Sequence, residues 1–193
     1  GQDLLQRFPG CEEHSVVASA AAADVPVYTS SPGDSSIGMN IASNALLEGS
    51  SFMIDPNRDV NEVCAIILSG HQNGCVILGG GSPKNFYLQG QPTLWEVYSI
   101  PKGGNDYFIQ ITTAQVVWGG LSGAPPAEAV SWGKVNPGVL SDTVVAYCDL
   151  AALTIGKQRL GVIFLASAHR RVTGMANAEV TRQTAKHFFA KDL

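Results

Sequence analysis

The sequence carries little charge and no long block of either sign. Lys, Arg, Asp and Glu make up only 15% of its 193 residues, and the formal net charge is −4. Proteins that bind along a nucleic acid need clustered basic side chains to contact the phosphates, so this composition argues against a nucleic-acid partner. Hydrophobic residues make up 45% of the chain. That share is typical of a folded domain and excludes an intrinsically disordered segment.

Long apolar runs and paired metal-ligand motifs are also missing. The longest apolar run, Gly161–Ala168, is too short to cross a bilayer and ends in His169, Arg170 and Arg171. We therefore expect a buried strand or short helix there and no membrane association. The four cysteines form no CxxC pair and no Cys/His cluster, which predicts reduced, buried thiols, no metal site and a cytoplasmic location. They are Cys11, Cys64, Cys75 and Cys148.

The length suits a single domain with a sizeable core, and we interpret residues 1–193 as one domain, itself a part of a larger one. No signal peptide opens the chain. It begins at Gly1 rather than at Met, within a segment that has the composition of a helix. This start indicates a fragment, a processed product or one half of a longer protein.

Apolar runs alternate with helical patterns along the chain, which predicts an α/β fold with a Rossmann-like, mostly parallel sheet flanked by helices. The expected strands are short and β-branched; they are Val25–Tyr28, Cys75–Leu78, Tyr107–Ile111 and Val144–Tyr147. The expected helices show apolar residues at helical spacing or are rich in alanine; they cover 12–23, 35–46, 61–70 and 176–191. The Gly-rich stretch 113–126 is predicted to be a long functional loop.

Two places at predicted strand ends suit a nucleotide. Gly79, Gly80 and Gly81 follow the strand 75–78 directly and precede Pro83, so the backbone N–H groups there can approach a phosphate closely. The pattern is neither GxGxxG nor GxxxxGK, and a plain tight turn explains it equally well. Asp149 follows the last predicted strand, where it is either a ribose ligand or a helix cap.

The segment from Ser122 to Lys134 is the strongest candidate for chemistry. Lys134 lies beside Trp132 and near Val130 in the sequence, and partial burial among such residues lowers the pKa of an amine and frees it to attack a carbonyl or imine. Glu128 is available to orient a cationic substrate or to carry a proton. The alternative is a surface lysine next to an aromatic residue that only covers the core.

Five sequence motifs favour a reactive Lys134 over a surface lysine, because together they resemble a known family. They are VPVYTSSPGDSSIG, LGGGSPKNF, ITTAQ, SGAPPAEAVSWGKV and VVAYCD, and they span residues 25–149. In this order and spacing they resemble the deoxyhypusine synthase family, and more closely its bacterial deoxyhypusine-synthase-like branch, of which this chain looks like the C-terminal half. The EAVSWGK string, which ends at Lys134, is the most specific of the matches.

The resemblance implies an NAD-dependent transferase. In that family the lysine of the SWGK motif forms an imine with an aminobutyl group taken from spermidine, and the group finally passes to a lysine of a translation factor. It implies that Lys134 is the covalent nucleophile and that Glu128 and Trp132 form the polyamine pocket. It further implies a homotetramer and a set of NAD-lining residues, which are Asp34, Gly80, Gly81, Thr113, Ser122 and Asp149.

Four positions depart from the family pattern. Met39, Trp118 and Leu121 stand where the family has acids that bind the spermidine nitrogens, and Asn85 stands in place of a histidine. The segment 88–102 is also longer than in the eukaryotic pattern. These changes make another amine a plausible substrate and keep open a second hypothesis, a non-catalytic partner subunit that retains the fold. A dehydrogenase without a covalent step fits the SWGK match poorly.

Overall fold

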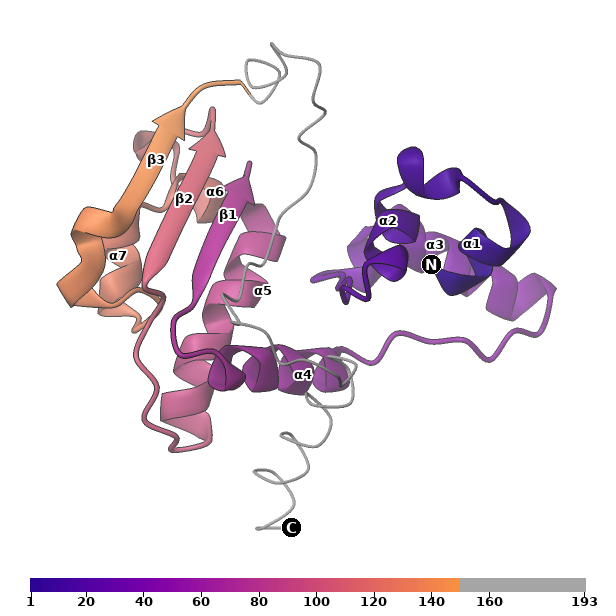
Figure 1. The fold of residues 1–193 in the computed structure, drawn as a ribbon, viewed down its shortest axis with the longest axis horizontal. Helices are drawn as coiled ribbons and strands as arrows, with labels where there is room; N and C mark the ends of the chain where they lie inside the picture. The colour runs from indigo at the N-terminus through magenta and orange to yellow at the C-terminus, as the bar shows by residue number, and fades with distance from the viewer. Residues whose placement is uncertain (150–193) are drawn as a thin grey trace.

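The computed structural model describes residues 1–149. Its N-terminal part consists of short helices, and its remainder is a three-stranded sheet with helices beside it (Figure 1). The N-terminal elements are α1 (Gln2–Arg7), the 3-10 helix η1 (Cys11–Glu13), α2 (Val16–Ala22), the 3-10 helix η2 (Pro32–Asp34) and α3 (Ser36–Leu47). The remaining elements are α4 (Pro56–Ser69), β1 (Gly74–Leu78), α5 (Gly81–Pro92), the π-helix η3 (Thr93–Val97), β2 (Tyr107–Thr112), the 3-10 helix η4 (Val116–Trp118), α6 (Gly120–Gly123), α7 (Pro126–Ser131), the 3-10 helix η5 (Pro137–Asp142) and β3 (Thr143–Tyr147).

The sheet is parallel throughout and has the order β1-β2-β3. Gly74 pairs with Tyr107 across the first ladder, and Phe108 pairs with Thr143 across the second. The predicted α/β class with a mostly parallel sheet is therefore confirmed. Since parallel strands all end at one edge, the glycine run after β1 and Asp149 after β3 lie at the same carboxyl edge.

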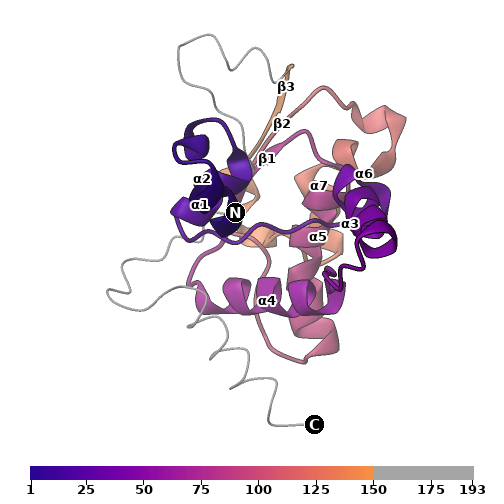
Figure 2. The same cartoon turned by 90° about the vertical axis from the view of Figure 1, so that its right-hand side faces the viewer.

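Among residues 1–149, the core lies against one face of the sheet. In Figure 2 the strands are seen nearly edge-on, with α5, α6 and α7 on one side. Phe108 of β2 and Ile77 of β1 point to that side and are buried, as are Ile67 of α4 and Leu88 of α5. On the opposite face the apolar side chain of Ile109 is 44% exposed. Buried and exposed side chains therefore alternate along β2, so one face of the sheet is packed against helices and the other is open.

Helix α4 begins earlier than predicted. The expected helix over 61–70 is present, but its first turn starts at Pro56, and the Asp55 side chain accepts hydrogen bonds from the backbone N–H groups of Asn57 and Arg58. An Asp-Pro pair is a standard helix start, because the carboxylate caps two free N–H groups and proline lacks one. The predicted helix over 12–23 is split in two, since Ser15 caps a new helix, α2.

The predicted strand Val25–Tyr28 is wrong. This segment is extended but pairs with no strand among the residues that the structure describes. It passes α5 instead, where the Tyr28 ring packs against the Phe86 ring with 6.1 Å between centroids. Three residues later, the Ser31 and Ser82 hydroxyls are hydrogen-bonded at 2.8 Å. The β-branched and aromatic residues of this segment fit the pattern of a strand, but the segment packs against helix α5 and joins no sheet among the described residues.

The cysteine predictions hold only in part. All four thiols are free, but only Cys64 and Cys75 are buried, whereas Cys11 and Cys148 are half-buried. Burial raises the pKa of the Cys75 thiol to about 12, so it stays protonated at neutral pH. None of the helices within residues 1–149 is long and apolar enough to span a bilayer. The predictions for Gly161–Ala168 and for the helix 176–191 fall outside the described residues.

Candidate active site

The connection from β1 to α5 is a corner made of glycine backbone. Gly79, Gly80 and Gly81 all have positive φ values, of 81°, 157° and 72°. A Cβ atom added to Gly80 would lie 2.7 Å from the Cα atom of Ser122, closer than real Cβ atoms approach other atoms. The corner is therefore a close contact between two backbone segments that glycine alone permits. The predicted tight turn is present, and the nucleotide approach stays a prediction.

Gln110 of β2 links this corner to Ser122 of α6. Its side chain is buried, and its Nε2 donates hydrogen bonds to the carbonyl oxygens of Gly79 at 2.8 Å and Ser122 at 2.7 Å. Its Oε1 accepts a hydrogen bond from the Nζ of Lys84 at 2.9 Å. Each polar atom of this buried amide is thus paired. Sequence reasoning missed Gln110, because its only signal was a polar residue in an apolar strand.

The backbone of Lys134 is anchored from two directions. After α7, Gly133 takes a positive φ of 66° and the N–H of Lys134 donates to the carbonyl of Ala129 at 3.0 Å, which closes the helix. The carbonyl of Lys134 accepts hydrogen bonds from the backbone N–H of Asn105 at 3.0 Å and from its Nδ2 at 3.1 Å. The next residue, Val135, is buried in the core. The amine of Lys134 is therefore presented by a fixed backbone.

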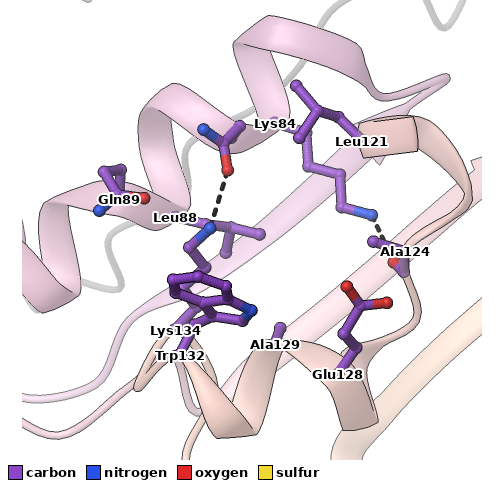
Figure 3. Close-up of a pocket in the computed structure, with 10 residues that line it drawn as sticks. Lys84, Leu88, Gln89, Leu121, Ala124, Glu128, Ala129, Trp132 and Lys134 are labelled. Carbon is purple, nitrogen blue, oxygen red and sulfur yellow. Dashed lines mark hydrogen bonds between the residues drawn. The ribbon is translucent and has the colours of Figure 1, made fainter. Parts of the chain in front are cut away.

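A cavity of about 330 Å³ opens between α5 and α7, and the Lys134 side chain reaches into it (Figure 3). The predicted residues Lys134, Glu128 and Trp132 all line this cavity. The other lining residues come mainly from α5 and α6 and the loop that follows α6; they are Lys84, Asn85, Leu88, Gln89, Leu121, Ala124 and Ala129. Within the described part of the chain, no three His, Cys, Asp or Glu side chains come close enough together to hold a metal ion.

Lys134 is held inside the cavity by one polar and one aromatic neighbour. Its Nζ donates a hydrogen bond to the Oδ1 of Asn85 at 2.8 Å and lies 5.6 Å from the centre of the Trp132 ring. Burial lowers the pKa of Lys134 below its usual value, while the nearby Glu128 carboxylate acts in the opposite direction. A lowered pKa increases the fraction of neutral amine, the form that attacks carbon.

Lys84 is a second lysine in the same cavity, and sequence reasoning missed it. Its side chain is only 5% exposed, and its Nζ donates to the backbone carbonyl of Ala124 at 2.7 Å as well as to Gln110. Burial is the main cause that lowers the pKa of Lys84 to about 8; the nearby Lys134 acts in the same direction, while Cys75 and Glu128 act in the opposite one. Lysines are seldom buried unless paired, so this residue needs an explanation beyond packing.

The residues assigned to NAD by resemblance lie along the carboxyl edge of the sheet. Gly80 and Gly81 form the corner after β1 and contact Ser122, and Thr113 follows β2 directly. Asp149 follows β3. Asp34 ends η2, three residues after Ser31, whose hydroxyl is bonded to Ser82 of α5. Five of these six residues therefore lie at one edge of the sheet. The sixth, Asp34, lies in a turn that is joined to α5 by the Ser31–Ser82 hydrogen bond.

The four departures from the family pattern have different surroundings. Met39 and Trp118 are each 70% exposed, and neither is among the residues that line the cavity. Leu121 lines the cavity, and Asn85 makes the hydrogen bond to Lys134 described above. Glu128 is the only carboxylate among the lining residues that the structure describes. The cavity therefore combines one acid with two lysines.

Comparison with known proteins agrees with the motifs. The family described as deoxyhypusine synthase matches residues 2–154. A "Deoxyhypusine synthase-like protein" of Nostoc punctiforme is 54% identical over 149 residues, 75% of this chain and 38% of that protein. A protein of the same name from Thermosynechococcus vestitus is 56% identical over 146 residues, 72% of this chain and 36% of that protein.

An archaeal protein is also similar, at lower identity. A "Probable deoxyhypusine synthase 2" of Methanosarcina acetivorans is 40% identical over 137 residues, 71% of this chain and 39% of that protein. The chain thus spans about two-fifths of the length of these relatives. The family match covers both the SWGK lysine in its cavity and the glycine corner, and on this evidence the chain belongs to the deoxyhypusine synthase family.

Proposed function

We propose that this chain carries the catalytic lysine of an NAD-dependent transferase, which moves an aminobutyl group from spermidine or a related polyamine to an amine acceptor through an imine on Lys134. The observation that carries the proposal is the placement of the Lys134 Nζ. It lies in a cavity between α5 and α7, bonded to Asn85 at 2.8 Å and beside Trp132, with a pKa below its usual value. The family fold alone, without an amine in this cavity, would not support a covalent transfer reaction.

The work of Lys134 is to exchange with a leaving amine. As a neutral amine it attacks the carbon of an oxidised substrate, a C–N bond forms to Nζ, and the bond to the leaving amine breaks as that nitrogen takes up a proton. Asn85 suits this role because its Oδ1 accepts a hydrogen bond from either protonation state of the lysine and cannot itself take the proton. It therefore orients Nζ without consuming its lone pair.

The cavity walls favour an imine over its hydrolysis products. Leu88, Ala129 and Trp132 form apolar surface around the Lys134 side chain, and limited access of water protects an imine. The Trp132 side chain is 61% exposed, so this wall is incomplete in the described residues alone. We propose that the remainder of the active site comes from other parts of the assembly.

The glycine corner fits a dinucleotide. Gly80 and Gly81 place backbone N–H groups at the start of the twelve-residue helix α5, with no Cβ atom in front of them. Asp149 follows β3, two strands away at the same edge. Gly80, Gly81, Ser122, Thr113 and Asp149 would hold NAD there, with Asp34 approaching from η2. When bound, NAD supplies the acceptor and later the donor of a hydride.

Partners and surroundings follow from the family. We propose a polyamine as donor, a lysine of a translation factor as acceptor, and a cytoplasmic homotetramer. Large apolar side chains on the surface support an assembly, since a monomer seldom exposes such patches. Examples are Val117, at 89% exposure, and Trp118.

One set of observations favours a second function, that of a non-catalytic partner subunit. Trp118 and Leu121 replace acids that bind polyamine nitrogens in the family, so Glu128 is left as the single carboxylate of the cavity. Loss of charge partners from a polyamine site weakens binding. The two functions differ in whether Lys134 forms a covalent bond.

Borohydride trapping tests this directly. The intact protein is incubated with radiolabelled spermidine and NAD, reduced, digested and mapped by mass spectrometry. We expect the label on Lys134 and none in Lys134→Arg, because a guanidinium cannot be deprotonated at working pH and so cannot attack. NAD affinity should remain within about threefold, as the corner at 79–81 is untouched. Lys102→Arg is the matched control, since Lys102 bonds to the Gly70 carbonyl outside the cavity. Label in Lys134→Arg, or none in the wild type, contradicts the proposal.

A further inference from the structure

Trp95 lies against the SWGK turn, residues 131–134, although it is not among the residues that line the cavity. A Cβ atom added to Gly133 would lie 2.6 Å from the Nε1 atom of Trp95, 3.0 Å from its Cε2 atom and 3.1 Å from its Cζ2 atom. These three atoms belong to one indole ring, so the ring occupies the side of Gly133 on which any other residue would carry its side chain. Gly133 also has a φ of 66°, so this position requires glycine for two independent reasons.

The element that carries Trp95 is a π-helix, η3, and the sequence gives a reason for it. Pro92, the last residue of α5, has no N–H to donate to the carbonyl of Leu88. The widened turn that follows is closed by the N–H of Tyr98, which donates to the carbonyl of Thr93, five residues earlier, at 3.1 Å. Turns of this kind are rare and occur frequently at functional sites.

The backbone of η3 is anchored on both sides of Trp95. Leu94 is fully buried in the core cluster. Tyr98 packs against the same cluster, and its hydroxyl donates a hydrogen bond to the Oδ1 of Asn61 in α4. Trp95 is 45% exposed and Val97, in the same turn, is 68% exposed. An anchored backbone therefore holds the indole ring in its place beside the SWGK turn.

This contact complements the one that holds the other side of Lys134. The carbonyl of Lys134 is bound by Asn105, as described above, and Trp95 covers Gly133 on the preceding side. The position of this short backbone segment determines where the Lys134 Nζ can reach the Oδ1 of Asn85, at 2.8 Å. A misplacement of about 1 Å at a reacting group can lower a rate about 100-fold.

We propose that Trp95 is a positioning residue for the transfer reaction. Its ring keeps Gly133 and the SWGK turn in place, and the turn presents the Lys134 amine to the carbon that it attacks. Trp95 lines no part of the cavity and acts through the turn alone. The inference rests on the proposed function and adds to it a residue outside the cavity, one that affects the covalent step and not the binding of substrate.

Borohydride trapping on the intact protein, at saturating spermidine and NAD in a single turnover, measures the covalent step. We expect Trp95→Ala to lower the rate of imine formation by about 10- to 100-fold, with the Kd of NADH and of spermidine within about twofold. Trp95→Phe keeps an aromatic ring and should stay within about fivefold of the wild-type rate. Val97→Ala is the control and should trap at the wild-type rate. An unchanged rate in Trp95→Ala, or a loss confined to spermidine or NADH affinity, would overturn the inference.

A substitution at Gly133 tests the same contact from the other side. In the wild type the Cβ of Gly133→Ala meets both the ring and an unfavourable φ, whereas in Trp95→Ala only the φ remains. We expect Gly133→Ala to lower the trapping rate by at least about tenfold in the wild type and by less than about threefold in Trp95→Ala. Gly49→Ala is matched in φ, at 66°, and has no atom within 4 Å of its added Cβ, so it should leave the rate unchanged. Equal losses in the two backgrounds would show that ring and turn act independently, against the proposal.

Amide hydrogen exchange in the ligand-free protein separates this inference from the proposed function. The N–H of Lys134 donates to the carbonyl of Ala129 at 3.0 Å, so its exchange reports opening of the SWGK turn. We expect faster exchange at this amide in Trp95→Ala and wild-type exchange in Val97→Ala. Unchanged exchange in Trp95→Ala would refute the role of Trp95. If exchange responds as expected while the wild type traps no spermidine, the proposed function fails and the support of the turn by Trp95 stands.

Discussion

Residues 1–54 and residues 56–149 both carry many apolar side chains but pack them very differently. Within the described part of the chain, the buried members of the core cluster run from Val63 to Val135, and Tyr28 packs against them from the N-terminal region. Within residues 1–54, all of which the structure describes, Ala18 is the one buried hydrophobic side chain. Leu46 is 85% exposed and Met53 is 76% exposed. An apolar pattern therefore becomes a core only where a second element lies opposite it, as α5 does for the sheet.

The N-terminal region also has few anchors on the rest of the chain. Two of them are the Tyr28–Phe86 ring contact and the Ser31–Ser82 hydrogen bond. Its helices contact mainly one another, and α3 has no buried residue. Among the described residues, this region therefore has few contacts that hold it against residues 56–149.

The sharpest test of this difference is one substitution made in both regions. Phe108→Ala removes a ring that is fully buried against the helices and should cost about 3–5 kcal/mol of unfolding free energy. Phe52→Ala removes a ring that is 66% exposed and should change that free energy by less than about 0.5 kcal/mol. Urea unfolding of the intact protein, followed by circular dichroism, measures both. Similar losses for the two variants would show that Phe52 is buried in the assembly.

A second prediction concerns the polar centre of the packed region. Gln110→Leu removes the partner of Lys84 and of the Gly79 and Ser122 carbonyls, so we expect a loss of about 2–4 kcal/mol. Gln115→Leu is the control, as Gln115 is exposed. Thermal unfolding of both variants reports the difference. Equal transition temperatures would mean that water replaces the buried amide at little cost.

The glycine corner gives a third, smaller effect. Gly80→Ala should cost about 1–3 kcal/mol and weaken NAD binding, because its Cβ would press on the backbone of Ser122. Gly33→Ala, in the N-terminal region, has no atom within 4 Å of its added Cβ and should be nearly neutral. Fluorescence titration with NADH and a thermal melt of each variant check the pair. Unaltered nucleotide affinity in Gly80→Ala would separate the corner from the nucleotide.

The smallest effect is expected at the link between the two regions. Ser31→Ala removes the bond to Ser82 and should cost about 0.5–1.5 kcal/mol. The loss should appear as faster amide hydrogen exchange over 25–34, with exchange in β1–β3 unchanged. Ser51→Ala, at an exposed position, is the control. If exchange rises in the sheet as well, the two regions unfold as one unit.

Much of the packed region could be predicted from sequence. The runs 75–78, 107–111 and 144–147 are short, apolar and β-branched, and each is a strand of the parallel sheet. The SWGK motif located the cavity, because the spacing from Glu128 through Trp132 to Lys134 covers the end of α7 and the turn after it. Local patterns were sufficient here because neighbouring elements in sequence are also neighbours in space.

The contacts that complete the cavity could not be predicted in the same way. Lys84 bonds to Gln110 and Ala124, and Lys134 bonds to Asn85. These pairs are 26 to 49 residues apart in the sequence, and no local periodicity predicts contacts over such separations. The wrong strand at Val25–Tyr28 has a similar cause, because local composition is compatible with a strand wherever the chain is extended. Asp55 and Pro56 did mark the start of α4, and this signal was available in the sequence.

The all-parallel arrangement has a consequence for the order in which the protein takes shape. Gly74 can pair only after Tyr107 has been synthesised, and Phe108 only after Thr143. Neither pair of strands can therefore form as a local hairpin. Ladders of such long separation form slowly. During synthesis, at about 5–20 residues per second, Lys134 leaves the ribosome seconds after Asn85, its eventual partner. The Lys134 amine therefore joins its contact with Asn85 late, after the residues of β1 and α5 have been synthesised.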